Sequence, residues 1–135
     1  MRILIVEDDA LVAMVLTECL ENDGHEVVGP AATLDEAVAL CEGGLPELAL
    51  LDIELRGGSN GVALAHALFA RWRLPVIFTS AQTAEARGAS GVALGHICKP
   101  YEPETVLRSV AVARAVIDGG TPESIPAGFE FFAPG

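Results

Sequence analysis

The apolar residues of this chain alternate between short continuous runs and longer stretches with helical periodicity. Short continuous runs are typical of strands buried on both faces of a parallel sheet, and a period of about 3.6 residues indicates helices that cover those faces. The alternation therefore predicts repeated strand and helix units in one α/β domain with an open, doubly wound parallel sheet. The five expected strands are residues 2–7, 25–29, 47–52, 75–79 and 93–98.

Amphipathic stretches between these runs predict the helices. A capping box at residues 33–36 begins one of them, because a threonine is followed three residues later by a glutamate. Residues 83–87 predict only a short helix, since glycines follow closely and lower helix stability. The longer expected helices are residues 10–22, 33–41, 60–72 and 103–117.

Composition excludes two classes of partner. Nineteen acidic residues against eight basic ones give a net charge of -11, which repels nucleic acid and anionic membrane surfaces. The three cysteines have no metal-ligand spacing, and the sequence has neither a signal peptide nor an apolar run of membrane-spanning length. We therefore expect a cytoplasmic protein that binds no nucleic acid and no membrane.

The C-terminal residues differ from the rest in composition. Residues 119–135 contain three prolines and four glycines, whereas all expected strands and helices lie within residues 1–118. We predict one domain over residues 1–118 and a tail over residues 119–135 without an output domain. The aromatic cluster of Phe129, Phe131 and Phe132 is expected to fold back onto the surface or to dock on a partner.

Four of the expected strands lead directly into polar residues. In an open doubly wound sheet, ligands bind outside the carboxyl ends of the strands, so these side chains are expected to meet in one site. Lys99 is the only lysine of the chain, and its compact ammonium is not equivalent to the planar guanidinium used elsewhere. In chain order the residues are Glu7, Asp8 and Asp9, then Asp52, then Thr79 and Ser80, and finally Lys99.

This set of residue types predicts phosphoryl transfer. If the first and third strands are neighbours, their ends lie about 4.8 Å apart, so Glu7, Asp8 and Asp52 need a cation to neutralise them. A hard divalent ion that accepts carboxylate oxygens and bridges to a phosphoryl group describes Mg²⁺. Asp52, alone on its strand, is then the best candidate for the nucleophile. Lys99 would balance the phosphoryl charge, and Thr79 would offer its hydroxyl to a phosphoryl oxygen.

Four runs of the chain resemble the receiver domain of two-component response regulators. The resemblance covers residues 1 to about 118, with the motifs in the same order and near the same spacing. It implies a flavodoxin-like, five-stranded parallel sheet with strand order 2-1-3-4-5. The matching runs are residues 3–9, 50–55, 78–81 and 99–101.

The resemblance also implies a role for each polar residue at the strand ends. Asp52 is the implied phosphoacceptor, which takes its phosphoryl group from a sensor histidine kinase or a histidine phosphotransfer protein. Asp8 is the implied direct ligand of Mg²⁺, Glu7 a ligand through water, and the backbone carbonyl of Glu54 a further ligand. The domain is expected to signal to a downstream protein target.

The remaining implied roles concern the response to phosphorylation. Thr79 is the implied switch hydroxyl, and Lys99 binds the phosphoryl group, with a cis peptide bond before Pro100. His96 lies three residues before the lysine, where many receivers have a switching tyrosine or phenylalanine, so we expect it to take part in the switch.

Neither the oligomeric state nor the class of activity is fixed by these residues alone. Much of the family dimerises through its fourth helix, and because that helix is expected to be short here, the oligomeric state is not predicted.

A small phosphatase of the haloacid dehalogenase type also uses a nucleophilic aspartate, a hydroxyl, a lysine and Mg²⁺. In such enzymes the nucleophile follows the first strand, whereas Asp52 follows the third, and no cap domain is present here. Two further candidates are a receiver that acts only as a phosphate sink and a pseudo-receiver that binds partners without phosphorylation.

Overall fold

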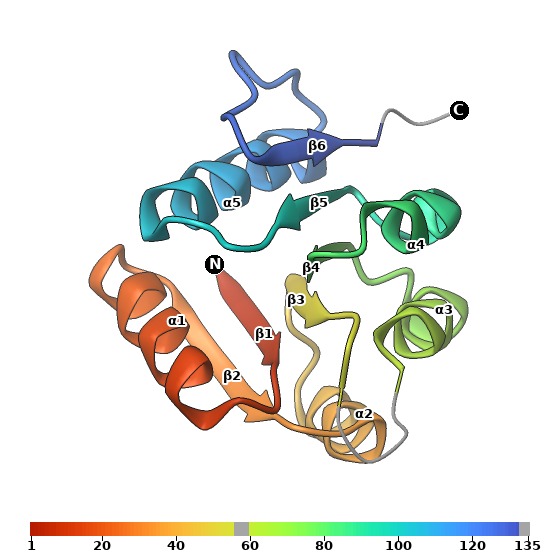
Figure 1. Ribbon diagram of the computed structural model, residues 1–135. Coiled ribbons are helices and arrows are strands. Elements are labelled where there is room, and N and C mark those ends of the chain that lie inside the picture. The colour runs from red at the N-terminus through yellow and green to blue at the C-terminus, as the bar shows by residue number, and fades with distance from the viewer. Residues whose placement is uncertain (56–59, 133–135) are drawn as a thin grey trace.

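The structure is a computed structural model that describes residues 1–55 and 60–132. Strands and helices alternate along the chain as predicted, and each element is labelled in Figure 1. The strands are β1 (Arg2–Val6), β2 (Glu26–Ala31), β3 (Leu48–Asp52), β4 (Val76–Ser80), β5 (Gly95–Cys98) and β6 (Phe129–Phe131). The helices are α1 (Ala10–Asn22), α2 (Leu34–Gly43), α3 (Gly61–Trp72), α4 (Thr83–Gly88), the short 3-10 helix η1 (Ser90–Val92) and α5 (Pro103–Ile117).

The strands within the described residues form one sheet in the order β2-β1-β3-β4-β5-β6 (Figure 1). The first five strands pair in parallel, which confirms the predicted α/β fold and the strand order 2-1-3-4-5. The sixth strand pairs antiparallel with β5. The expectation of a sheet with only five strands was therefore wrong at this edge.

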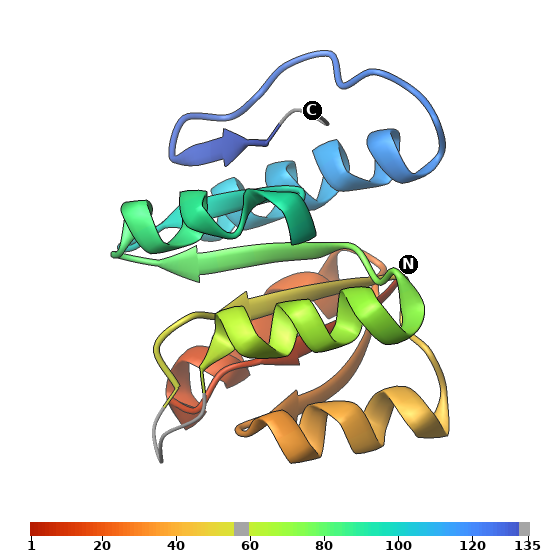
Figure 2. The ribbon, with the colours of Figure 1, turned by 90° about the vertical axis from the view of Figure 1, so that its right-hand side faces the viewer.

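Helices cover both faces of the sheet. One face lies under α1 and α5, and Figure 2 looks onto the other face, which α2, α3 and α4 cover. Side chains of β1 alternate between the two layers: Ile3 and Ile5 pack toward α1 and α5, and Leu4 and Val6 toward the opposite layer. Each of the four is at most 1% exposed. Burial on both faces is the physical reason for the continuous apolar runs.

Local signals in the sequence place the helix starts. The Asp9 side chain accepts hydrogen bonds from two amides of the first turn of α1, and the Thr33 hydroxyl accepts one from the amide of Glu36 at 3.2 Å. Asn60 caps α3 in the same way, and α5 begins with Pro103. The caps of α1 and α3 lie close to the ends of β1 and β3, so these helices start next to the polar residues singled out above.

The aromatic residues near the C-terminus fold back onto the molecule. After α5, residues 118–128 return along that helix and lead into β6 (Figure 2). Phe129 is only 6% exposed, so the cluster covers part of the core. The division into a domain at residues 1–118 and a tail at residues 119–135 stays a prediction, and residues 133–135 lie outside the described part of the chain.

No helix within residues 1–55 and 60–132 combines the length and the apolar character needed to span a bilayer.

Candidate functional site

The carboxyl ends of four strands meet at one edge of the sheet and bring the predicted site residues together. Glu7 and Asp8 directly follow β1, Asp52 is the last residue of β3, and Lys99 directly follows β5. Thr79 lies in β4, where it is the direct cross-strand partner of Asp52. Residues that are up to 92 positions apart in the sequence therefore lie at one edge of the sheet.

Asp52 is held by hydrogen bonds on both carboxylate oxygens. The Lys99 ammonium donates to Oδ2 at 2.9 Å, and the backbone amide of Glu54 donates to Oδ1 at 3.0 Å. The residue is only 3% exposed. Asp52 is thus a buried, oriented carboxylate with a cation next to it, which is an arrangement suited to a nucleophile.

Lys99 stands between two carboxylates. Its Nζ atom lies 2.9 Å from Asp52 Oδ2 and 3.6 Å from Glu7 Oε1. Partial burial of the ammonium favours the neutral form, but the hydrogen bond to Asp52 and the negative charges nearby outweigh it and raise the pKa of Lys99. The lysine therefore keeps its positive charge and can pair with an anionic ligand.

Glu7 is a buried carboxylate with one unsatisfied oxygen. It is 5% exposed, and while Oε2 accepts a hydrogen bond from the amide of Asp9, Oε1 has no hydrogen-bond partner within the described residues. The pKa of Glu7 is raised to about 7, mainly by burial and also by the nearby Asp52 carboxylate, while the Asp9 amide and the Lys99 charge oppose the shift. A second cation next to Glu7 would offset the free-energy cost of its buried negative charge.

The acidic residues have the geometry of a metal site. Carboxylate oxygens of Glu7, Asp8 and Asp52 all lie within 4.8 Å of one another. Oxygen ligands of this kind suit Mg²⁺, and the unsatisfied Oε1 of Glu7 supports the need for a cation. The residues present therefore fit the predicted ion. The Glu54 carbonyl as a further ligand stays a prediction, although its amide orients Asp52 and its side chain accepts a hydrogen bond from the Ser80 hydroxyl.

His96 and Lys99 are both linked to the end of β4. His96 is 2% exposed, and its Nε2 lies 2.8 Å from the carbonyl oxygen of Ser80, so this nitrogen carries a proton. The amide of Lys99 donates to the same carbonyl oxygen at 3.0 Å. Any shift of β4 next to Thr79 would thus reach both residues. The peptide bond between Lys99 and Pro100 is cis, as the resemblance implied.

Sequence reasoning missed one residue that positions the site. Gly61 begins α3 and lies against the end of β3, where a Cβ atom would come within 2.2 Å of the backbone oxygen of Asp52. The amide of Gly61 also donates to the carbonyl oxygen of Ile53 at 3.0 Å. The only signal in the sequence was a glycine directly after the capping Asn60, a position where most residues are tolerated.

Comparisons with known proteins agree with this geometry. Residues 3–111 match the family model described as "Response regulator receiver domain". The phyllosphere-induced regulator PhyR of Methylorubrum extorquens is 37% identical over 114 residues, which are 83% of this chain and 43% of PhyR. The transcriptional regulatory protein PdtaR of Mycobacterium tuberculosis is 29% identical over 115 residues, or 83% of this chain and 56% of PdtaR. The chain thus spans about half the length of these relatives.

Solved structures show the same fold. The receiver domain of NtrX from Brucella abortus superposes with a TM-score of 0.76 at 29% identity, and the match covers 86% of this chain and 98% of that one. The response regulator PhyR from Brucella abortus superposes with a TM-score of 0.69 at 32% identity, over 84% of this chain and 51% of that one. The similarity therefore includes both the sequence and the sheet that carries the site.

Proposed function

We propose, because this chain belongs to the response regulator receiver family, that it takes a phosphoryl group onto Asp52 from a histidine kinase or a histidine phosphotransfer protein in the cytoplasm. Membership of this family supports a role as a phosphoacceptor in signalling. The observation that supports Asp52 as the acceptor is its buried carboxylate, with the Lys99 ammonium 2.9 Å away and two further carboxylates beside it.

The proposed reaction moves one phosphoryl group. A carboxylate oxygen of Asp52 attacks the phosphorus of the donor phosphohistidine, a mixed anhydride forms, and the bond from nitrogen to phosphorus breaks. Lys99 pairs with the negative phosphoryl oxygens, and the Thr79 hydroxyl donates to one of them. Asp8, Asp52 and the Glu54 carbonyl would hold Mg²⁺ directly and Glu7 would hold it through water, and the ion would supply positive charge near the phosphoryl oxygens.

The output in this proposal is a protein interaction rather than turnover of a substrate. Receiver domains are regulators, and the relatives are named as regulators. The phosphatase alternative has no support among the relatives, and the nucleophile follows β3 rather than β1. We therefore propose that the phosphorylated chain binds a downstream protein, with Thr79 and His96 as the residues that move.

The first prediction tests the acceptor. With acetyl phosphate and Mg²⁺, the intact mass of the protein should rise by one phosphate, and Asp52→Asn should abolish the rise because an amide is not a nucleophile of this kind. Asp35→Asn is the matched control, since Asp35 is an exposed carboxylate in the first turn of α2 and does not belong to the acidic cluster of the site. Labelling of Asp52→Asn at the parental level would refute Asp52 as the acceptor.

The second prediction tests the metal site. A ligand that binds only the folded state stabilises it by RT ln(1 + [L]/Kd), so Mg²⁺ at ten times Kd adds about 1.4 kcal/mol. We expect thermal melting of the parent protein to shift upward with Mg²⁺, and Asp8→Ala to lose the shift. Asp35→Ala should keep it. An equal shift in Asp8→Ala and the parent would exclude Asp8 as a ligand.

A further inference from the structure

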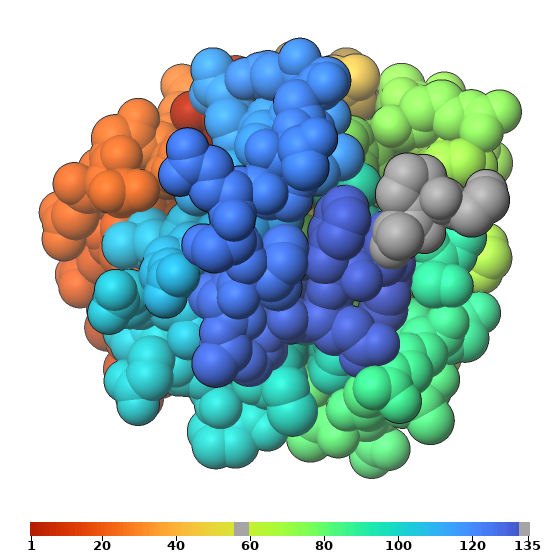
Figure 3. Space-filling view, turned by 90° about the horizontal axis from the view of Figure 1, so that it is seen from above, coloured from red at the N-terminus to blue at the C-terminus, as the bar shows by residue number. Residues whose placement is uncertain are grey.

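β6 occupies the outer edge of β5, the edge that would otherwise lie open between α4 and α5. Figure 3 looks onto this face and shows the C-terminal segment lying across it between the two helices. Five consecutive residues of β5 and its flanks are paired: the amide of Cys98 donates to the Gly128 oxygen at 2.9 Å, and the amide of Phe132 donates to the Leu94 oxygen at 2.8 Å. The backbone contacts are therefore those of a strand added to a sheet edge.

On the α5 side of the sheet, an aromatic ring fills a space left by a glycine. Phe129 belongs to the buried cluster that includes Val106 and Val110 of α5, and its ring lies directly over Gly95. A Cβ atom at position 95 would come within 2.4 Å of that ring and within 2.6 Å of the Glu130 backbone oxygen. Gly95 thus forms a seat for an aromatic residue of the added strand.

On the α4 side, a cation meets an acidic residue of the same strand. Nε of Arg87 lies 2.8 and 2.9 Å from the two carboxylate oxygens of Glu130, which is the direct cross-strand partner of His96. The pair is largely exposed, so it adds little stability. The Arg87 guanidinium favours an acidic residue at the position of Glu130. The residues on either side of it, Phe129 and Phe131, lie on the α5 side of the sheet.

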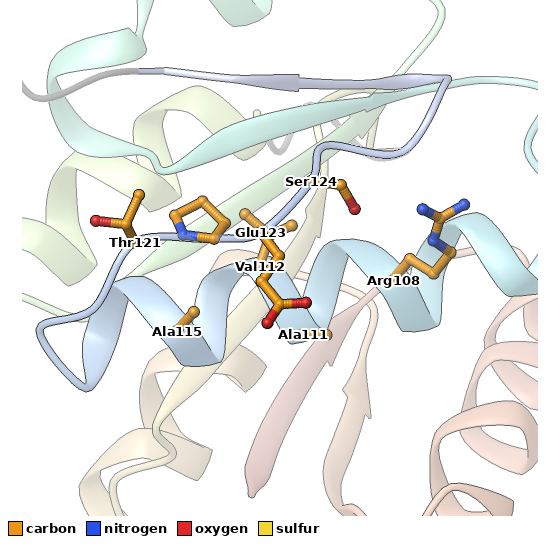
Figure 4. Close-up of a pocket in the computed structure, with 8 residues that line it drawn as sticks. Arg108, Ala111, Val112, Ala115, Thr121, Glu123 and Ser124 are labelled. Carbon is orange, nitrogen blue, oxygen red and sulfur yellow. The ribbon is translucent and has the colours of Figure 1, made fainter.

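Most of the segment that leads from α5 into β6 is exposed. Residues 121–124 pass over α5 (Figure 4). Together with Arg108 and Val112 of that helix they line a hollow of about 420 Å³. Ile125, next along the chain, is 43% exposed. Because residues 121–125 are mostly exposed, β6 is held mainly by its own contacts and by the buried Pro126, and it can leave β5 while α5 stays in position.

A continuous row of paired residues joins this edge to the phosphoacceptor. Asp52 pairs with Thr79 across β3 and β4, Thr79 with Ile97 across β4 and β5, and Ile97 with Phe129 across β5 and β6. His96, the neighbour of Ile97, hydrogen-bonds to the Ser80 carbonyl beside Thr79. A displacement of Thr79 toward a phosphoryl oxygen would therefore be transmitted to the strand that pairs with β6.

We propose that the outer edge of β5 is a binding groove for an extended protein segment with the pattern aromatic, acidic, aromatic, and that β6 is its resident internal ligand. The segment of a partner protein enters by strand addition, with one aromatic residue on Gly95 and its acidic residue on Arg87. The regulation of this groove rests on the proposed function: phosphorylation of Asp52 loosens β6, and the partner segment replaces it. A tethered strand acts at an effective concentration on the order of millimolar, so the partner gains access only when that hold weakens.

The groove is tested with a fluorescent peptide that has the sequence of residues 126–132. The double variant Phe129→Ala/Glu130→Ala weakens the resident strand and leaves Gly95 in place, so it should bind the peptide saturably. The parent protein, whose groove is filled, should bind at least about tenfold more weakly. Adding Gly95→Ala to the double variant should abolish binding, because the new Cβ atom blocks the aromatic seat.

Several results would overturn the groove. Equal peptide binding with glycine or alanine at position 95, or no binding by the double variant, would exclude it. A dimer of the parent chain that dissociates in the double variant would assign the edge to a second copy instead of a partner. Gly95→Ala alone provides a measurement on the intact C-terminal sequence: hydrogen exchange should become faster at residues 128–132 and stay slow in β3 and β4.

The regulation is tested by hydrogen exchange with Mg²⁺ and beryllofluoride, together with intact mass after acetyl phosphate. Exchange at residues 128–132 should accelerate by about tenfold or more, together with a change in residues 79–101. A phosphate gain with unchanged exchange at residues 128–132 would refute the regulation and favour a phosphate sink. Peptide binding to the groove without any phosphate gain on Asp52 would instead refute the proposed function and leave the groove standing.

Discussion

Replacing Glu7 by glutamine is expected to raise the free energy of unfolding of the metal-free protein by on the order of 2 to 3 kcal/mol at pH 8. The charged Glu7 carboxylate is buried, faces the Asp52 carboxylate, and leaves Oε1 without a hydrogen-bond partner in the described residues. Glutamine has nearly the same shape and no charge, so the variant avoids the cost of ionisation. The same change should weaken Mg²⁺ binding, because it removes a carboxylate ligand.

The stabilisation by Glu7→Gln should depend on pH in a defined way. Glu7 has a pKa of about 7 in the folded protein against 4.5 as the ordinary value, so its ionisation disfavours the folded state. The cost is absent below pH 4.5, grows between pH 4.5 and 7, and is complete above pH 7. The difference in unfolding free energy between Glu7→Gln and the parent should follow this course in urea titrations with a chelator present.

An exposed glutamate provides the control. Glu21→Gln, on the solvent side of α1, should change the unfolding free energy little at either pH. A Glu7→Gln difference of the same size at acid pH and at pH 8 would show that packing, and not the buried charge, causes it. Mg²⁺ should raise the unfolding free energy of the parent more than that of Glu7→Gln. The buried charge that destabilises the metal-free protein is thus the charge that binds the metal.

The sheet was predictable because its strands are buried on both faces. Continuous apolar runs such as residues 3–6 and 48–51 are typical of such strands, and the caps between them mark the helix starts. The fifth expected strand was placed two residues too early, because the chain leaves a 3-10 helix at Val92 and β5 begins only at Gly95. β6 was missed because three alternating residues between prolines and glycines carry too little periodicity.

The site was predictable to the extent that it depends on strand ends. Glu7, Asp52 and Lys99 each terminate a buried run, and parallel strands bring their carboxyl ends to one edge. Contacts between backbone segments leave no such pattern in the sequence. The bond from His96 to the Ser80 carbonyl and the approach of Gly61 to Asp52 depend on how the elements pack, which residue type and spacing do not reveal.

Gly61→Ala is expected to destabilise the fold by about 2 kcal/mol or more, because overpacking against a fixed backbone cannot be relieved by a rotamer change. The added methyl would lie 2.2 Å from the Asp52 backbone oxygen and 2.8 Å from the Ile53 Cα atom, so β3 and α3 must separate. Asp52 sits at the end of that strand, and its distance of 2.9 Å to Lys99 would change with it.

Phosphorylation should therefore fall together with stability in Gly61→Ala, even though the variant leaves every charged group of the site intact. Gly43→Ala, at the end of α2, is the matched control, since no described atom outside the adjoining backbone lies within 4 Å of the added methyl. It should leave both the urea midpoint and the rate of phosphate gain from acetyl phosphate near the parental values. If Gly61→Ala retained the parental midpoint and rate, the end of β3 could shift without cost. Close packing against α3 would then have no part in positioning the phosphoacceptor.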